Sequence, residues 1–166
     1  MVKEISFGVI GGLGLFLYGM KLMGDGMQKA AGDRLRRILE ILTGNIFLAI
    51  LVGALVTAVI QSSSATTVMV VGFVNAGLMT LQQAIGVIMG ANIGTTITAW
   101  LIAINLSEWA FPAIGIGVML TMISKNKTYR YVGQTFLGFG LLFLGLDTMG
   151  SSMAAIKESP KIAQLF

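Results

Sequence analysis

Cysteine and histidine are both absent from this 166-residue chain, and charged residues are scarce. The lack of cysteine excludes a disulfide framework and thiol chemistry. The lack of histidine removes the commonest general base and transition-metal ligand. The acidic residues are scattered, and no two are spaced as an acid–base pair would be. We therefore predict that the protein is not an enzyme and has neither a transition-metal site nor an organic cofactor.

Charged residues make up 11% of the chain and hydrophobic residues 55%, whereas soluble domains carry about 25% charged residues. This composition predicts an integral, multi-pass membrane protein, and the location that we expect is the plasma (inner) membrane. At ~20 residues per crossing, the length allows roughly four or five spans. The basic residues flank apolar runs, so we interpret the net charge of +4 as a topology signal and expect no nucleic-acid partner.

The apolar runs predict an all-α membrane protein forming one transmembrane domain over 1–166. About four transmembrane helices are expected, together with one re-entrant helical hairpin, and one of the four helices is broken. The predicted segments are a glycine-rich helix (5–23), an amphipathic surface connector (24–40), the hairpin (44–78), the broken helix (83–106), two further helices (110–124 and 131–149) and a polar tail (150–166).

The hairpin is predicted from a polar run, Gln61–Thr67, inside a stretch from Ile41 to Ser107 that contains no ionisable side chain. Hydroxyl and amide groups cost free energy in hydrocarbon unless they are hydrogen-bonded. The apolar piece after the run, Val68–Leu78, is 11 residues long, well below the ~20 needed to span. Two half-length helices with the run as their tip fit this pattern. The tip either packs against protein or lines a cavity and holds a ligand there.

The broken helix is predicted from the segment after the hairpin. Thr80 and Gln83 have the spacing of a capping box that starts a helix. Gly86, Gly90 and Gly94 are four apart and would form one smooth face. The polar residues of Asn92–Thr96 lie at mid-span depth, and we expect the helix to be interrupted there. Function and helix packing explain that segment equally well.

Orientation is predicted from the basic residues, five of which lie in 21–40 and three in 125–130. The positive-inside rule places both clusters in the cytoplasm and both termini outside. The hairpin would then enter and leave from the cytoplasmic side.

The predicted tip has a chemistry of its own. Free amides at the start of the second half-helix favour an anion, and the helix dipole adds to this preference. Free carbonyls at the end of the first half-helix suit a small cation. Such a tip could bind an oxyanion and an alkali cation without any fixed charge.

The two motifs closely resemble the type II sodium/phosphate cotransporters, particularly the prokaryotic members. The resemblance rests on Gly53–Thr67, which contains Gln-Ser-Ser-Ser, on Gly90–Thr96 and on the opening Gly12–Met20. It implies sodium-coupled uptake of inorganic phosphate, with sodium as the coupling ion, by a fold of two inverted repeats. It implies that phosphate is bound by Gln61, Ser62, Ser63 and Ser64. Sodium neighbours would be Ser64, Thr66, Asn92, Thr95 and Thr96.

This chain holds one Gln-Ser-Ser-Ser, where the resemblance implies two. We therefore expect either the N-terminal repeat of a longer transporter or a half-size protein that pairs with a second copy as a homodimer. Its other partners would be phosphate, sodium and membrane lipid. Two alternatives remain open at this stage. The chain could be a packing or regulatory membrane subunit, or a symporter of another small oxyanion or a carboxylate.

Overall fold

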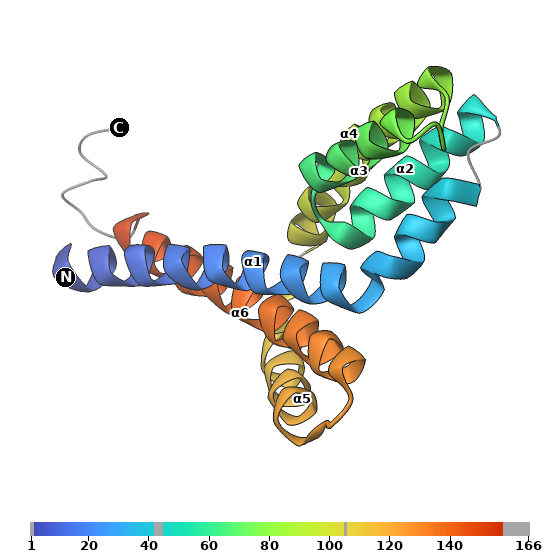
Figure 1. The fold of residues 1–166 in the computed structure, drawn as a ribbon. Coiled ribbons are helices and arrows are strands. Elements are labelled where there is room, and N and C mark those ends of the chain that lie inside the picture. The colour runs from blue at the N-terminus through green and yellow to red at the C-terminus, as the bar shows by residue number, and fades with distance from the viewer. Residues whose placement is uncertain (1, 42–44, 105, 158–166) are drawn as a thin grey trace. The chain divides into compact units, whose positions relative to one another are not determined.

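The computed structural model describes residues 2–41, 45–104 and 106–157, and over these residues every regular element is helical (Figure 1). The elements are α1 (Val2–Ile41), α2 (Ile46–Ile60), α3 (Ser63–Asn75), α4 (Leu81–Ala103), η1 (Ser107–Trp109), α5 (Ala110–Ile123) and α6 (Lys127–Lys157). The predicted all-α class is therefore confirmed. The start of the predicted hairpin before Asn45, the position Asn105 and the end of the predicted tail lie outside the described residues.

Three helical segments among the described residues are long and apolar enough to cross a membrane, as judged by length and composition. They are Lys3–Ala31, Leu81–Ala103 and Lys127–Ala154. The remaining predicted span, 110–124, is the helix α5, but it is 14 residues long and belongs with the shorter apolar helices. It is short because a 3-10 turn at Ser107–Trp109 precedes it and the backbone turns extended at Ser124.

The predicted helix (5–23) and the predicted connector (24–40) belong to one helix. α1 runs without interruption from Val2 to Ile41. Gly24 lies inside the helix, and no described residue of α1 has the positive φ that would end it. The amphipathic pattern itself is present, because Leu39 is fully buried while Arg34 and Arg37 are exposed.

The predicted break in the fourth segment is wrong, since α4 is one continuous helix of 23 residues. The polar side chains at Asn92, Thr95 and Thr96 donate to carbonyl groups of the same helix. The Asn92 amide donates to Ile88 O at 3.2 Å, and Thr95 donates to Ala91 O at 3.1 Å. Such back-bonding lets hydroxyl and amide groups remain inside a helix. The predicted capping box is confirmed, because Thr80 N–H donates to Gln83 Oε1 at 2.7 Å and Gln83 N–H donates to Thr80 Oγ1 at 3.3 Å.

The last predicted helix, 131–149, is longer at both ends. α6 begins at Lys127, so residues 127–130 of the basic cluster at 125–130 are helical. Asn126 precedes the helix and accepts a hydrogen bond from Thr128 N–H at 2.9 Å, as a capping residue does.

The chain forms two compact units, one made of residues up to Met23 together with those after Ile104, the other of Gly24–Ile104. The prediction of a single domain stays a prediction. In the first unit, glycines pack α1 against α6. A Cβ atom on Gly12 would lie 2.8 Å from Gly145 O, and one on Gly138 would lie 2.6 Å from Gly19 O. Gly12 and Gly19 are seven residues apart on α1, and Gly138 and Gly145 are seven residues apart on α6. Each pair therefore lies on one face of its helix.

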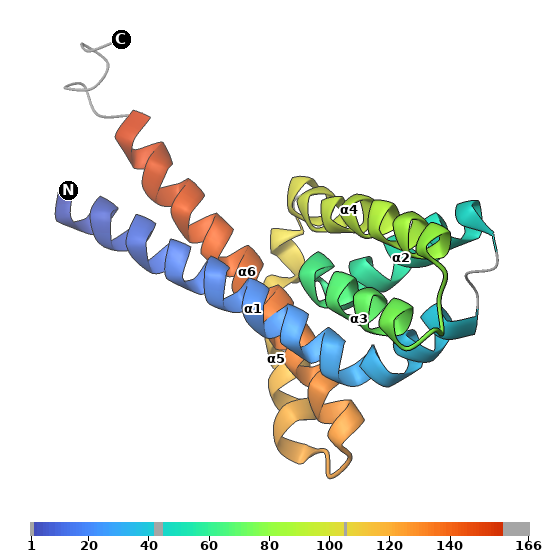
Figure 2. The ribbon, with the colours of Figure 1, turned by 45° about the horizontal axis from the view of Figure 1, so that its top comes forward.

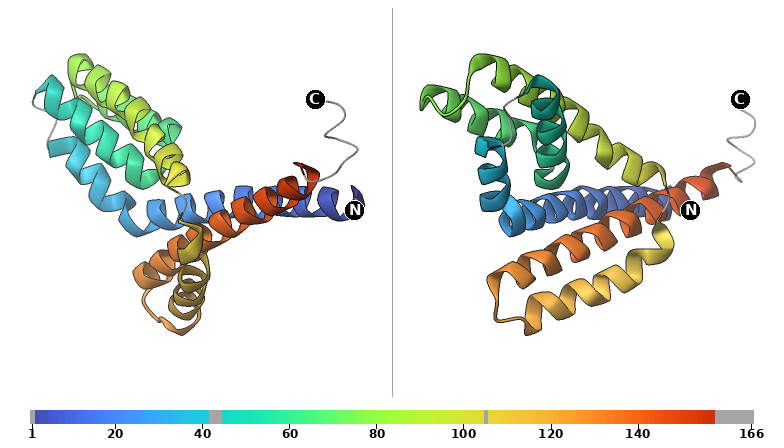
Figure 3. Two further views of the ribbon diagram at one scale, coloured as in Figure 1. Left: turned by 180° about the vertical axis from the view of Figure 1, so that it is seen from behind. Right: turned by 90° about the vertical axis from the view of Figure 1, so that its right-hand side faces the viewer.

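The α5–α6 pair of the first unit is packed in the same way, and the two helices lie side by side in both views of Figure 3. A Cβ atom on Gly117 would lie 2.8 Å from Gly133 O. Small residues let helices approach closely in lipid. The glycines at these positions therefore form packing faces between the helices.

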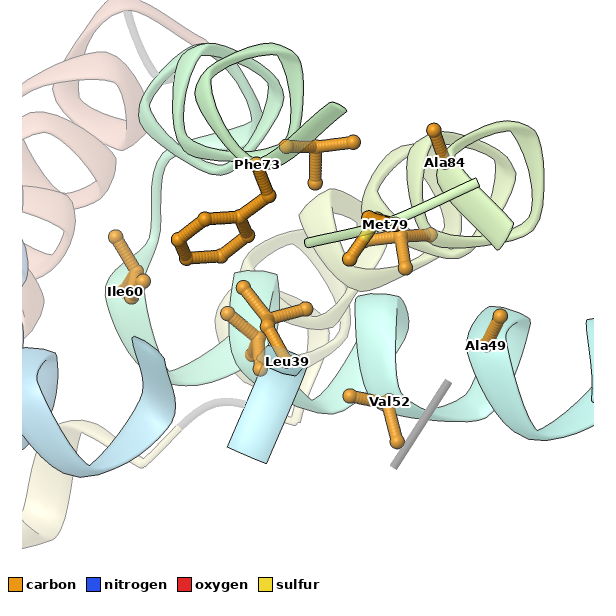
Figure 4. Packing of buried hydrophobic residues seen from close by; sticks show 10 residues of the cluster. Leu39, Ala49, Val52, Ile60, Phe73, Met79 and Ala84 are labelled. Atoms are coloured by element: carbon orange, nitrogen blue, oxygen red, sulfur yellow. The ribbon is translucent and has the colours of Figure 1, made fainter. Parts of the chain in front are cut away.

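The second unit has a core shared by the C-terminal part of α1 and helices α2, α3 and α4. Its fully buried side chains include Leu39, Val56, Val70 and Val87. Figure 4 shows Phe73 of α3 and Leu39 of α1 pointing into the space between their helices.

The predicted smooth face of α4 packs directly on the backbone of α2. A Cβ atom placed on Gly86 would lie 2.8 Å from Ala49 Cβ. One placed on Gly90 would lie 2.8 Å from Ala54 N, and one placed on Gly94 would lie 3.0 Å from Ala58 N. Successive glycines of α4 thus meet successive turns of α2 in the same chain direction. The two helices therefore run parallel, in a register fixed by the glycine row.

Gly90→Ala is expected to lower the free energy of unfolding by about 1–3 kcal/mol, because overpacking forces the α2 and α4 backbones apart. The measurement is an SDS titration of the detergent-solubilised chain followed by circular dichroism. Gly72→Ala in α3 is the matched control, since nothing lies within 4 Å of its added Cβ. It should be neutral or stabilising by up to about 1 kcal/mol. Equal effects of the two changes would contradict the packing described above.

Candidate functional site

The chain reverses direction between α2 and α3 over two residues, Gln61 and Ser62, and Figure 2 shows the two helices antiparallel. Gln61 adopts the left-handed conformation, with φ 58° and ψ 26°, and donates its N–H to Thr57 O at 2.7 Å. It is the one described non-glycine residue with positive φ. Residues that have a Cβ rarely adopt this backbone conformation, so the residues around Gln61 must stabilise it.

The predicted tip, Gln61–Thr67, is therefore longer than the observed turn, because Ser63–Thr67 already belong to α3. Ser62 is the reason. Its backbone is extended, and its Oγ accepts a hydrogen bond from Ala65 N–H at 3.2 Å. This is an N-cap, which starts a helix at the next residue.

A buried threonine pair joins the two arms of the hairpin just below the turn. Thr57 donates its hydroxyl to Thr66 Oγ1 at 3.0 Å, and Thr66 donates to Ser62 O at 3.1 Å. Both threonines are 0% exposed. Thr66, a predicted sodium neighbour, thus has hydrogen bonds within the hairpin. Thr57 is absent from the predicted site, although it is the one polar residue of α2 and could have been noticed on that ground.

The Gln61 side chain is held at both ends of its amide. Its Nε2 donates to Ala58 O, and its Oε1 accepts a hydrogen bond from the hydroxyl of Thr98 on α4. The sequence interpretation missed Thr98. The available signal was spacing, because Thr98 continues the row of Gly86, Gly90 and Gly94 at the same interval of four.

The other serines lie at the start of α3. Ser63 is half-buried and Ser64 is exposed. Their amides precede the first backbone bond of the helix, in which Thr66 N–H donates to Ser62 O at 3.2 Å. The first amides of a helix have no carbonyl partner within it and carry partial positive charge. This end of α3 can therefore attract an anion.

The remaining predicted residues, Asn92, Thr95 and Thr96, are exposed on α4. Each is hydrogen-bonded to a carbonyl of its own helix, Thr96 to Ile93 O at 2.7 Å. The hydrogen bond from α4 to the turn comes from Thr98 instead. The assignment of all these residues to phosphate or sodium stays a prediction.

An open pocket of about 440 Å³ lies at the beginnings of α2 and α4, lined by Asn45, Ile46, Thr80, Gln82 and Gln83. The turn at Gln61 follows the opposite end of α2, so this pocket is not part of the turn. Among the described residues, no group of three or more acidic side chains gathers as a metal site would require.

Residues 15–151 match the model of a protein family described as Na+/Pi-cotransporter. Over 159 residues, covering 95% of this chain, the sequence is 30% identical to the Escherichia coli K12 protein named "Putative inorganic phosphate export protein YjbB". It is 33% identical over 150 residues to the uncharacterised protein YqeW of Bacillus subtilis, covering 89% of this chain. It is 35% identical over 98 residues, 58% of this chain, to human sodium-dependent phosphate transport protein 2B.

The chain spans only part of each of these relatives. It covers 29% of YjbB, 48% of YqeW and 14% of the human protein. No solved structure matches the chain.

The threonine pair is expected to stabilise the hairpin. Thr66→Val should lower the free energy of unfolding by about 1–3 kcal/mol, because it leaves the buried Thr57 hydroxyl without its acceptor. Adding Thr57→Val should cost less than the sum of the two single changes, since the pair is then replaced by two apolar groups. The measurement is the same SDS titration. Thr67→Val, a half-buried neighbour, is the control, and strict additivity of Thr57→Val and Thr66→Val would refute the coupling.

Proposed function

Because this chain belongs to the Na+/Pi-cotransporter family, we propose that it moves inorganic phosphate across a membrane together with sodium. It does so either as one repeat of a longer transporter or as a pair of copies. In both cases the turn between α2 and α3 forms half of the binding site. A second repeat or copy supplies the facing half.

The observation that carries this proposal is the two-residue turn itself. It brings the carbonyl end of α2 and the amide end of α3 together, within a stretch from 41 to 107 that has no ionisable side chain. Phosphate would be bound by the amides of α3 with Gln61, Ser62, Ser63 and Ser64. Sodium would be bound by oxygens of Ser64, Thr66, Asn92, Thr95 and Thr96.

The lengths of the two arms support a re-entrant arrangement. α2 has 15 residues and α3 has 13. At 1.5 Å per residue these are about 22 and 20 Å long, short of the ~30 Å hydrocarbon layer. The hairpin would enter and leave from one side, with its turn near the middle of the membrane. Secondary transporters place substrate sites at that depth and build them from discontinuous helices.

The direction of phosphate movement has two candidates. The resemblance to the cotransporters favours uptake, and the name of the E. coli relative favours export. The name of the human relative states dependence on sodium but no direction. Net accumulation of labelled phosphate by intact cells that express the protein would support uptake, and faster loss of preloaded phosphate would support export.

The test is sodium-dependent movement of radiolabelled phosphate in proteoliposomes containing the chain. Equilibrium binding of labelled phosphate to the purified chain, with sodium or with potassium, is measured in parallel. We expect saturable phosphate binding that requires sodium. Arsenate and sulfate as competitors identify whether another oxyanion is preferred. The proposal is refuted if labelled phosphate neither moves nor binds in a sodium-dependent way, whether the chain is tested alone or as two linked copies.

Ser63→Ala with Ser64→Ala is the informative variant, because it removes two predicted ligands and leaves the Ser62 N-cap intact. We expect phosphate binding to weaken at least about tenfold, as loss of hydrogen bonds to a charged ligand implies. Ser151→Ala, on the exposed face of α6, is the control. If the double variant still binds phosphate but its helices no longer assemble, the serines are contacts between helices instead of ligands.

A further inference from the structure

Thr98 is the residue of α4 that reaches the hairpin turn. Its hydroxyl donates a hydrogen bond to Gln61 Oε1, while Gln61 Nε2 donates to Ala58 O. A donating hydroxyl can bond only to the oxygen of a side-chain amide, which is an acceptor. A carbonyl oxygen can bond only to the amide nitrogen, which is a donor. The two contacts together therefore fix which way the Gln61 amide faces.

The register of the glycine row explains why Thr98 arrives there. Gly94 meets the last turns of α2, since a Cβ atom on it would lie 2.9 Å from Thr57 Cβ and 3.0 Å from Ala58 N. Thr98 is one helical turn further along α4 and lies on the same face. It is the first residue of that row with a hydrogen-bonding side chain. The parallel packing of α2 and α4 thus delivers its hydroxyl to the residue that follows α2.

Gln61 needs such a restraint because its backbone is left-handed, a conformation disfavoured for residues with a Cβ. A strained residue of this kind persists only where its surroundings determine it. Gln61 precedes the Ser62 N-cap directly, so its φ and ψ set the direction in which the first amides of α3 point. The Thr98 hydroxyl ties this residue to a helix outside the hairpin.

We propose that Thr98 is a positioning residue, which acts through Gln61 to fix the first turn of α3 for binding of the oxyanion. This inference rests on the proposed function. It assigns no ligand contact to Thr98, which shapes the site from the far side of Gln61.

The first experiment compares phosphate affinity in the presence of sodium for Thr98→Val, Thr98→Ser and the unaltered chain. Thr98→Val keeps the shape and removes the hydroxyl, and we expect about tenfold weaker binding. Thr98→Ser keeps the hydroxyl and should restore most of the affinity. Thr135→Val is the control, because the Thr135 hydroxyl bonds only within α6, to Tyr131 O at 3.1 Å. Equal losses in the valine and serine variants would overturn the inference.

A double-mutant cycle tests whether Thr98 acts through Gln61. In a Gln61→Ala background, Thr98→Val should cause no further loss of affinity. A full further tenfold loss would show that Thr98 acts by another route, which contradicts the proposal.

Hydrogen exchange separates this inference from the proposed function. Without phosphate, the amides of residues 61–66 should exchange faster in Thr98→Val than in the unaltered chain, and Thr135→Val should leave them unchanged. Absence of phosphate binding both by the unaltered chain and by two linked copies refutes the proposed function. Unchanged exchange at the turn in Thr98→Val refutes the positioning role, whatever the binding result.

Discussion

The arrangement of the second unit depends on the direct contact between the α4 glycines and the α2 backbone. Gly86, Gly90 and Gly94 each meet a different turn of α2, at separations that leave no room for a side chain. Since lipid tails are as apolar as leucine, close packing of this kind is a main source of helix association in membranes. The contact fixes two helices in a parallel register and leaves α3 to return antiparallel. It also decides which residue of α4 meets the end of α2.

The polar groups near the turn divide into two sets. Thr57, Thr66, Gln61 and Thr98 are hydrogen-bonded to one another or to nearby carbonyls. These bonds satisfy groups that would otherwise be costly in an apolar surrounding. Helix packing accounts for the hydrogen bonds of this set. It does not explain Ser63 and Ser64, which follow the N-cap and are half-buried and exposed, respectively. The interpretation of the polar run as a site therefore rests on these two serines and the amides beside them.

The sequence predicted the helices, the reversal near Gln61, the Thr80–Gln83 capping box and the glycine face of α4, because each depends on local spacing. Prediction from the sequence failed where the local structure depends on side-chain hydrogen bonds, which residue spacing does not reveal. The break expected at Asn92–Thr96 does not occur, because those side chains bond to their own helix. Composition also cannot separate packed glycines from open ones. Gly12 and Gly19 contact α6, whereas Gly11 and Gly14 have nothing within 4 Å.

A site made of backbone dipoles places stricter demands on geometry than a site made of charges. A lysine or arginine attracts an anion over many orientations, and its side chain can follow the ligand. The first amides of α3 cannot do so, because their directions are set by the backbone before them. Their partial charge also acts only within about the first turn of the helix. A left-handed residue at Gln61, restrained from α2 by Ala58 and from α4 by Thr98, meets this demand without a fixed charge. A fixed charge would be expensive at the middle of a membrane. In the proposed transporter, the same absence of charge would keep an anion weakly enough held to be released.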